Sequence, residues 1–293
     1  MDTVPLEESH EVVDAIAPSK ERSLVLFTYS ESRIARLNLE FFLKKGLHNE
    51  TDFVFIFNGN TTAKELVPDR DNIRVVEREN HCFDLGAMGE VLREDDLWKN
   101  YRRFITMNAS IRGPFLPVYA SLCWTDLFLD RLTEKIKLVG TTLNCQPSPH
   151  VQSMLWATDD VGMGLLLNPD LSRTVGMADF WGTEEDPVGL SFCPETMDQA
   201  VHSEVGSTRL IEAQGFEVDV LMTAYAGARD PGTYCRAGQL DDALYDGKYY
   251  GSNLHPYELI FMKANRDIDP ILLEKMTEWH MNSDKDSYAM CSA

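Results

Sequence analysis

The sequence predicts an α/β fold, with a Rossmann-like, mostly parallel sheet flanked by helices and an elaborated C-terminal half. Short apolar, β-rich runs alternate with segments of helical spacing through the first half of the chain, a pattern typical of right-handed βαβ units. The 293 residues are 44% hydrophobic and 25% charged. These values are those of an ordinary globular protein with enough chain for a large core.

Five strands are expected in the first half, at residues 23–30, 51–60, 73–79, 101–110 and 135–145. The helices expected between them end near Gly46 or cover residues 83–95 and 119–132. In the second half we expect one or two strands around an acidic turn at 151–168, a helix at 194–214 and a late strand at 216–225. A glycine-rich loop or lid at 227–251, a strand at 259–263 and a terminal helix are expected to follow. Residues 1–22 indicate an acidic, flexible leader before a single domain at 23–293.

The charge balance excludes some partners. With 27 Lys+Arg against 47 Asp+Glu, the formal net charge is −20. Nucleic acid and anionic membrane surfaces are therefore not expected partners. We expect no transmembrane segment, because no apolar run approaches the roughly 18 residues that one requires, and the acidic N-terminus does not resemble a signal peptide. The six cysteines form no CxxC pair, so we expect reduced thiols and a cytoplasmic location.

Polar residues stand where the predicted strands end. They are Thr28 to Ser30, Asn58 to Asn60, Asn80 to Asp84, Asn108 to Ser110, and Thr142 to Asn144. Such residues are common in turns. Five polar strand ends in register nevertheless predict a polar cleft, because ligands of open α/β sheets bind beyond the carboxyl ends of the strands.

Several familiar motifs are missing. The sequence has no GxGxxG and no GxxxxGK[ST], which disfavours a dinucleotide-dependent oxidoreductase, a methyltransferase or a P-loop protein. It has neither GxSxG nor HExxH, and its seven histidines form no close pair. A zinc site built by the protein is therefore not expected.

Four motifs occur together in a particular order. They are Asn80-x-x-x-Asp84-x-Gly86-Ala87, Asn108-Ala109-Ser110 followed by Gly113-Pro114, His150-Val151-Gln152-Ser153, and Glu204-Val205-Gly206. Over about residues 24–225 this arrangement resembles sugar-nucleotide glycosyltransferases of the GT-A type. It is most similar to the rhamnan-synthesis F-type proteins and their uncharacterised fungal and algal relatives.

The resemblance implies a GT-A-like glycosyltransferase domain, with a donor-binding half at about 23–150 and an acceptor and lid half at about 151–293. Such an enzyme would transfer a hexosyl or deoxyhexosyl group from a nucleotide-sugar to a hydroxyl of a glycan or another acceptor, with inversion. The residues expected to bind the donor are Thr28, Ser30, Asn80, Asp84, Asn108, Ser110 and Arg112, and those expected to bind the acceptor are His150, Gln152 and Trp181.

Inverting transfer needs a base that deprotonates the acceptor hydroxyl. Glu204 is the first candidate, because it lies in a matching segment that opens a helix. Asp160, with its neighbour Asp159, is the second candidate, in an acidic turn that is equally consistent with a plain hairpin tip. Asp84 is interpreted either as a donor ligand or as a helix cap.

The expected cofactor is Mn²⁺ or Mg²⁺, which GT-A enzymes hold on an Asp-x-Asp motif after the fourth strand. Here the motif is replaced by Asn108-Ala109-Ser110, whose neutral oxygens hold hard cations weakly. Two alternatives follow. Asn108 and Ser110 bind the ion with help from Asp84, Asp159 or Asp160, or the reaction is metal-independent and Arg112 or another cation neutralises the diphosphate. The alternative function is a catalytically silent nucleotide- or carbohydrate-binding protein with the same fold.

Overall fold

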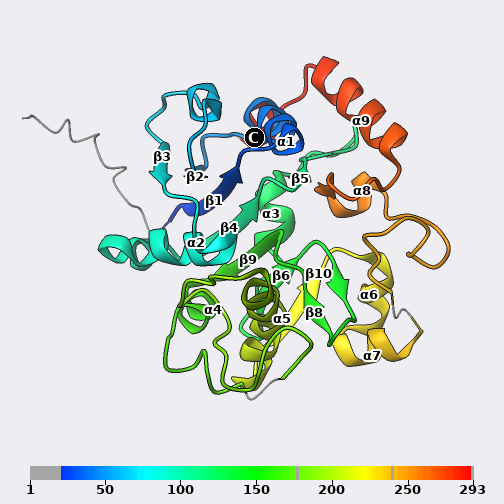
Figure 1. The fold of residues 1–293 in the computed structure, drawn as a ribbon. Coiled ribbons are helices and arrows are strands. Elements are labelled where there is room, and N and C mark those ends of the chain that lie inside the picture. The colour runs from blue at the N-terminus through cyan, green and yellow to red at the C-terminus, as the bar shows by residue number, and fades with distance from the viewer. Residues whose placement is uncertain (1–20, 176–177, 239–240, 292–293) are drawn as a thin grey trace, which may run out of the picture.

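The computed structural model describes residues 21–175, 178–238 and 241–291, and the predicted leader lies almost wholly outside them. A seven-stranded sheet crosses the molecule in the order β10-β6-β9-β4-β1-β2-β3 (Figure 1). Its strands are β1 (Ser23–Ser30), β2 (Thr51–Asn58), β3 (Ile73–Arg78), β4 (Arg103–Asn108), β6 (Ile136–Gly140), β9 (Leu155–Asp159) and β10 (Glu217–Val220). All neighbours pair in parallel except β9, which runs antiparallel to both β4 and β6. The predicted α/β class, with a mostly parallel sheet, is confirmed.

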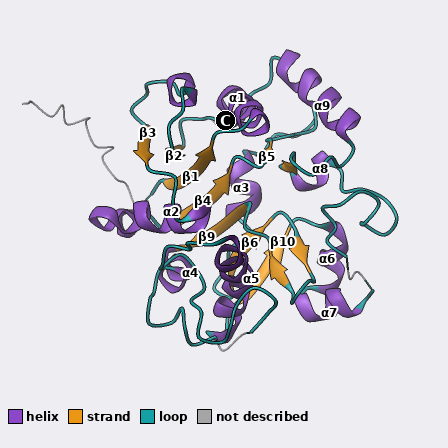
Figure 2. Ribbon diagram, in the orientation of Figure 1, coloured by secondary structure: helices purple, strands orange, loops and turns teal. Residues whose placement is uncertain are grey.

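Helices cover both faces of the sheet (Figure 2). One face carries α2 (Phe83–Arg93), α4 (Asp160–Leu166) and α5 (Met197–Ala213). The other face carries α1 (Arg33–Lys45) and α3 (Trp124–Leu129), which meet through Phe42 and Trp124 with ring centroids 5.8 Å apart. The helix α9 (Pro270–Asn282) also packs on α1.

The remaining elements are short. Two antiparallel pairs lie outside the main sheet, and the other helices connect or follow the strands. They are β5 (Ile111–Arg112) with β11 (Met262–Lys263), β7 (Leu143–Asn144) with β8 (His150–Val151), the 3-10 helices η1 (Ala63–Leu66) and η2 (Glu94–Asn100), and the helices α6 (Thr223–Ala228), α7 (Pro231–Arg236), α8 (Pro256–Leu259) and α10 (Ser287–Cys291).

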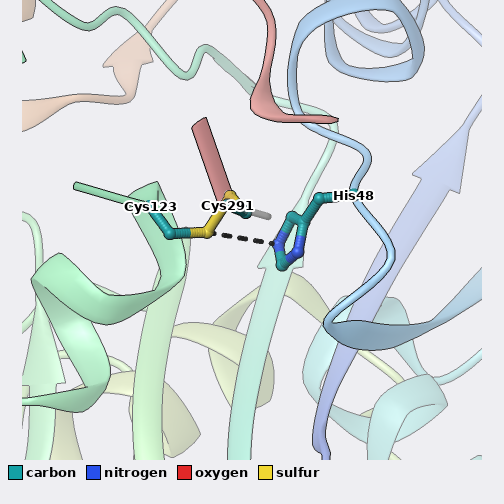
Figure 3. A group of neighbouring side chains, drawn as sticks. All are labelled: His48, Cys123 and Cys291. Atoms are coloured by element: carbon teal, nitrogen blue, oxygen red, sulfur yellow. Dashed lines mark hydrogen bonds between the residues drawn. A yellow bond between two sulfur atoms is a disulfide. The ribbon is translucent and has the colours of Figure 1, made fainter. Parts of the chain in front are cut away.

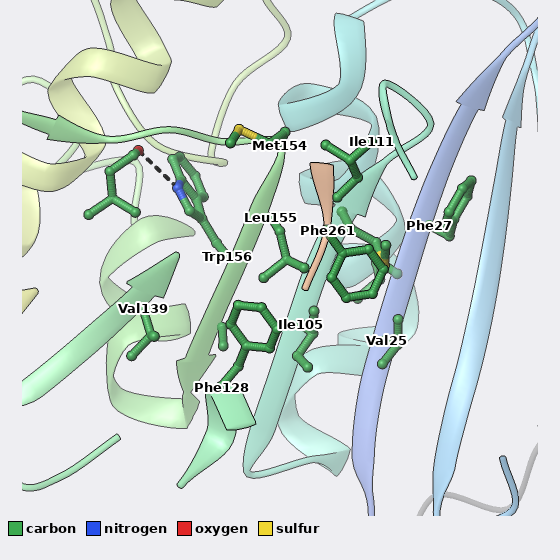
Figure 4. Close-up of a cluster of buried hydrophobic side chains, with 14 of the residues drawn as sticks. Val25, Phe27, Ile105, Ile111, Phe128, Val139, Met154, Leu155, Trp156 and Phe261 are labelled. Atoms are coloured by element: carbon green, nitrogen blue, oxygen red, sulfur yellow. Dashed lines mark hydrogen bonds between the residues drawn. The ribbon is translucent and has the colours of Figure 1, made fainter. Parts of the chain in front are cut away.

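The core lies between the sheet and its helices. Every residue of β2 is buried, and β1 is buried from Leu24 to Tyr29, as expected for strands covered on both faces. Figure 4 shows side chains of β1, β4, β6 and β9 meeting Phe128 of α3 and Phe261, which precedes β11. The body of the sheet is therefore apolar, and polar side chains are left for the ends of the strands.

Three disulfides join distant parts of the chain, so the prediction of reduced cysteines is wrong. The pairs are Cys82–Cys193, Cys123–Cys291 and Cys145–Cys235. Figure 3 shows the second pair, which fastens the last helix to the start of α3 beside His48. The even count of six allowed this pairing, but spacing alone cannot reveal it, because at least 90 residues separate the partners of each pair. Disulfides persist in oxidising compartments, so they weigh against the predicted cytoplasmic location. No helix in the described ranges is long and apolar enough to cross a bilayer.

Two segments differ from their predicted form. The acidic turn expected within 151–168 is the start of α4, because the side chain of Asp159 caps the helix by accepting the N–H of Gly162 at 2.9 Å. The predicted loop at 227–251 contains α7 and is anchored by the buried Leu244 and by the Cys145–Cys235 disulfide. It is therefore more closely packed than its glycine content suggests.

Candidate functional site

A cleft of about 540 Å³ opens at the carboxyl ends of β1, β2 and β4. Seven residues that were predicted to bind the donor or to act as the base line this cleft: Thr28, Ser30, Asn80, Asp84, Asn108, Ser110 and Glu204. They come from four segments that are far apart in the chain. The polar strand ends thus gather at one edge of the sheet, as the βα alternation predicts.

The antiparallel strand β9 completes one wall of this cleft. Its reversed direction places its amino end beside the carboxyl end of β4, where the N–H of Asn108 donates to the carbonyl of Met154 at 3.2 Å. Ser153, just before Met154, therefore lines the cleft together with Asn108-Ala109-Ser110, the polar triplet. A parallel strand at this position would have delivered Asp159 instead.

Asp84, Asn108 and Ser110 form one hydrogen-bonded group. The amide nitrogen of Asn108 donates to Asp84 Oδ2, and its amide oxygen accepts from both the backbone N–H and the hydroxyl of Ser110. This orientation of Asn108 is imposed by its neighbour, because a carboxylate can only accept. Asp84 Oδ1 also accepts the N–H of Leu85 at 3.1 Å. Asp84 is not the cap of α2, because the cap position is Cys82, but it lies in the first turn of that helix and lines the cleft. Its role as a donor ligand stays a prediction.

Glu204 extends from α5 into the same cleft, beside Ser153. The side chain of Thr196 caps this helix through the N–H of Gln199, which sets where the helix begins. Glu204 Oε1 accepts the N–H of Ser153 at 2.8 Å. Its second oxygen has no hydrogen-bond partner among the described residues, so it is available to a ligand.

Lys263 lines the same cleft, and the sequence analysis did not select it. It lies on β11, paired with Ile111 of β5, and the next residue donates its N–H to the carbonyl of Ser110 at 2.9 Å. Burial lowers the pKa of Lys263, and the negative charge of Glu204 partly restores it. In the sequence, Lys263 is only a single lysine after the apolar run at 259–262. This pattern does not indicate a binding site by itself, because the pairing of β11 with β5 is what brings the lysine to the cleft.

Two helices point their N-terminal turns at the cleft. Ser32, the cap of α1, lines it together with Ile34 and Ala35, and Phe83, Asp84 and Leu85 line it from the first turn of α2. Partial positive charge at these helix ends favours an anionic ligand. These helix ends and Lys263 favour an anionic group in a cleft that also carries the carboxylates of Asp84 and Glu204.

Arg112 was expected to be the cation of this site, but the structure does not place it there. Its side chain is buried, with Nε donating to Asn38 Oδ1 at 2.8 Å and Nη1 donating to Thr277 Oγ1 at 3.1 Å. Arg112 follows Ser110 by two residues, but it is directed toward α1 and α9. It joins these helices to β5 and does not line the cleft.

Asp160 also lies away from the other candidates. It begins α4 at the far end of β4, where Asp159 pairs with Arg103 in the sheet. Arg103 and Asn108 are separated by the length of β4, about 17 Å at 3.3–3.4 Å per residue. Asp159 is an ion-pair partner of Lys137 at 2.5 Å. Neither aspartate can act on a ligand held at the cleft.

The three residues expected to bind the acceptor are likewise outside the cleft lining. His150 is buried on β8, with Nδ1 2.8 Å from the carbonyl oxygen of Ser148. Gln152 is buried between Thr142, at 2.8 Å, and Asp242, at 3.3 Å. Trp181 stands beside the exposed Phe180 in the loop before α5. The structure brings none of these side chains to the ligand cleft.

Within the described ranges, two groups have three potential metal-ligating side chains close together. They are His48 with Cys123 and Cys291, and His81 with Cys82 and Glu90. Every cysteine in them belongs to a disulfide, which removes the thiolate that a metal needs. Neither group lies in the cleft.

Comparison with known proteins finds no family and no curated protein that matches the sequence. Among solved structures, a cytidylyltransferase from Leptospira borgpetersenii serovar Hardjo-bovis (strain JB197) is 10% identical, with a TM-score of 0.33 over 50% of this chain and 63% of that one. This chain thus spans less than two thirds of that protein. A 4-diphosphocytidyl-2C-methyl-D-erythritol synthase is 11% identical, with a TM-score of 0.35 over 68% of this chain and 88% of the other. At these values the likeness carries no conclusion about family or activity.

Proposed function

We propose that the protein is a nucleotide-sugar-dependent glycosyltransferase whose donor lies in the cleft at the carboxyl ends of β1, β2 and β4. The observation that carries the proposal is the convergence in one cleft of Asp84, Asn108, Ser110 and Glu204, which come from three of the four motifs of the resemblance. A volume of about 540 Å³ is in the range of pockets that hold small molecules and cofactors.

The shape and charge of the cleft suit the two parts of such a donor. Polar groups at Asn80 and Asp84 can bind ribose or base, since carboxylate and amide oxygens accept their hydrogens. The N-terminal turns of α1 and α2 and the nearby Lys263 suit the diphosphate. The sugar would then lie between the polar triplet and Glu204.

The proposed reaction is a direct displacement at the anomeric carbon. The acceptor oxygen forms a bond to that carbon as the bond from the carbon to the diphosphate oxygen breaks, and the electron pair leaves with the nucleoside diphosphate. The acceptor proton passes to the free oxygen of Glu204, whose other oxygen is held by Ser153. A base fixed in this way needs no reorientation during the reaction.

The proposal is tested by nucleotide binding and then by turnover. We expect UDP, GDP or CDP to raise the melting temperature at millimolar concentration, because a ligand that binds only the folded state stabilises it. Transfer or hydrolysis of a labelled nucleotide-sugar should fall about 100-fold or more in the Glu204→Gln variant. Asp198→Asn is the matched control, since Asp198 is exposed on the same helix outside the cleft.

Failure of every nucleotide to stabilise the protein would contradict the proposal. Equal turnover in the Glu204→Gln and Asp198→Asn variants would remove Glu204 from the base role. Binding without any turnover in the wild-type protein would instead favour a catalytically silent nucleotide-binding protein.

A further inference from the structure

The residues of the polar triplet do not suit a divalent cation. Mn²⁺ and Mg²⁺ need several free oxygens, preferably from carboxylates. The amide oxygen of Asn108 already accepts two hydrogen bonds from Ser110, and its amide nitrogen faces Asp84. Bringing that oxygen to a metal would expose the nitrogen to it and leave Ser110 without its acceptor. Within the part of the chain that the structure describes, Asp84 and Glu204 are the two carboxylates that line the cleft, and each already accepts a backbone N–H. Asp159 and Asp160 lie at the other end of β4.

Lys263 can supply the positive charge that a metal would otherwise bring to the cleft. Among the described residues that line the cleft, it alone carries a positive charge. The side chain of Lys263 makes neither a hydrogen bond nor an ion pair with another described residue. The side chain of Arg112, in contrast, donates to Asn38 and Thr277. The ammonium is thus free to bind an anionic ligand.

The fold holds Lys263 in this place. β11 pairs with β5, and the N–H of Ala264 donates to the carbonyl of Ser110. These backbone contacts therefore hold Lys263 beside the polar triplet. Burial lowers the pKa of Lys263 most, Glu204 and, more weakly, Asp84 and Asp242 raise this pKa, and Arg266 lowers it further. Arg266 is itself paired with Asp242 at 2.5 Å, so it does not compete for the ligand.

Building on the proposed function, we infer that Lys263 binds the diphosphate of the donor and stabilises it as a leaving group, so that neither binding nor transfer needs a divalent cation. A partly desolvated ammonium binds a diphosphate more strongly than an exposed one, because the surrounding dielectric is lower. It stabilises the charge that develops on the diphosphate oxygen as the bond to the sugar breaks.

The test is calorimetric binding of UDP, GDP and CDP to the wild-type protein in EDTA and in excess Mn²⁺, with the corresponding nucleosides as probes lacking phosphate. We expect the dissociation constant of the best diphosphate to agree within about twofold in the two buffers. Lys263→Gln should weaken diphosphate binding at least tenfold and leave nucleoside binding unchanged. Lys263→Arg should retain most of the affinity, and Lys99→Gln, at an exposed lysine outside the cleft, should retain all of it.

Each other outcome overturns the inference in a recognisable way. A tenfold or greater gain in wild-type affinity on adding Mn²⁺ contradicts it without any variant, so it stays falsifiable even if Lys263→Gln fails to fold. Equal affinity of the wild-type and Lys263→Gln proteins also contradicts it. Absence of diphosphate binding by the wild-type protein in both buffers overturns the proposed function as well, which separates the two failures.

Discussion

His48 shows what burial does to a single titratable side chain. It has no exposed surface, and its ring packs edge-on against Phe53 and Trp124. Nε2 lies 3.8 Å from Cys123 Sγ, and Nδ1 has no hydrogen-bond partner among the described residues. Burial and, secondarily, the charge of Arg22 lower its pKa from 6.5 to about 4. The folded protein therefore holds His48 neutral over a pH range in which the unfolded chain protonates it.

This shift predicts a loss of stability in acid. The unfolded state binds one more proton than the folded state between about pH 6.5 and pH 4, so stability is full above this window and falls as the pH falls through it. The loss is about 3 kcal/mol at pH 4, from 1.36 kcal/mol per pKa unit. Urea unfolding at pH 7 and pH 4 measures it.

The control for this prediction is His48→Gln, which cannot titrate. The fall in the free energy of unfolding between the two pH values should be about 3 kcal/mol smaller in this variant than in the wild-type protein. An equal fall in both proteins would show that His48 does not cause the acid sensitivity.

Among single residues, the sequence predicted cleft positions best where strands end. Asn108 and Ser110 follow a buried strand, and the βα alternation brings their strand end beside Asp84. Arg112 and Lys263 show the limit of such reasoning. Arg112 is near the polar triplet in sequence, but its side chain is directed toward α1 and α9. Lys263 is 153 residues beyond Ser110, but it pairs with Ile111, the residue after Ser110. Side-chain direction and long-range pairing are set by tertiary packing, which local patterns do not contain.

The helix α5 carries Glu204, and its position depends on a close approach at Gly206. A Cβ atom at Gly206 would lie 2.1 Å from Cγ1 of Val188, a distance that real atoms do not adopt. The glycine of the Glu-Val-Gly motif is therefore needed for packing, whereas the glutamate faces the cleft. One motif thus serves two purposes on neighbouring faces of one helix.

Gly206→Ala should move α5 away from the preceding loop. We expect it to lower the free energy of unfolding by about 1–3 kcal/mol, as for overpacked cores, and to weaken nucleotide binding. Chemical denaturation and calorimetry measure the two effects. Gly227→Ala is the matched control, since Gly227 also lies in a helix but a Cβ there would meet no atom within 4 Å.

The control should be neutral or more stable by up to about 1 kcal/mol, because alanine favours helix over glycine. A Gly206→Ala protein as stable as the Gly227→Ala protein would contradict the packing argument.

At the level of elements, most strands and helices of the first half could be predicted from the sequence, because their apolar runs are long and regularly spaced. The acidic segment at Asp159 was harder to predict from the sequence. The sequence was interpreted there as an acidic turn carrying a catalytic base or as a plain hairpin tip, and the structure shows instead that Asp159 caps α4, which packs against β9. The site assignment of Asp160 depended on that choice.

Across the whole molecule, the Cys82–Cys193 disulfide joins two segments that lead into the cleft. Cys82 precedes Asp84 at the start of α2, and Cys193 lies in the segment that leads to α5 and Glu204. Cys145–Cys235 instead joins the ends of β7 and α7 outside the cleft. The net charge of −20 concerns the whole surface, while ligand binding depends on the few charges that line the cleft.

Removing these disulfides one at a time should separate stability from binding. Replacing Cys82 and Cys193 together by serine should cost about 2–4 kcal/mol of stability, as disulfides that close long loops do, and should weaken nucleotide binding. The same change at Cys145 and Cys235 should cost a similar amount of stability without affecting affinity. Thermal unfolding and calorimetry at a temperature where both variants are folded measure this. Equal affinities in the two variants would contradict a role for the first disulfide in holding the cleft.

Binding of the donor in the cleft can be tested by a crystal structure of the protein soaked with the nucleoside diphosphate that stabilises it best. We expect the diphosphate within hydrogen-bonding distance of Lys263 Nζ, between the polar triplet and the N-terminal turns of α1 and α2, with the nucleoside toward Asn80 and Asp84. A nucleotide bound elsewhere on the molecule, with this cleft holding only solvent, would contradict it.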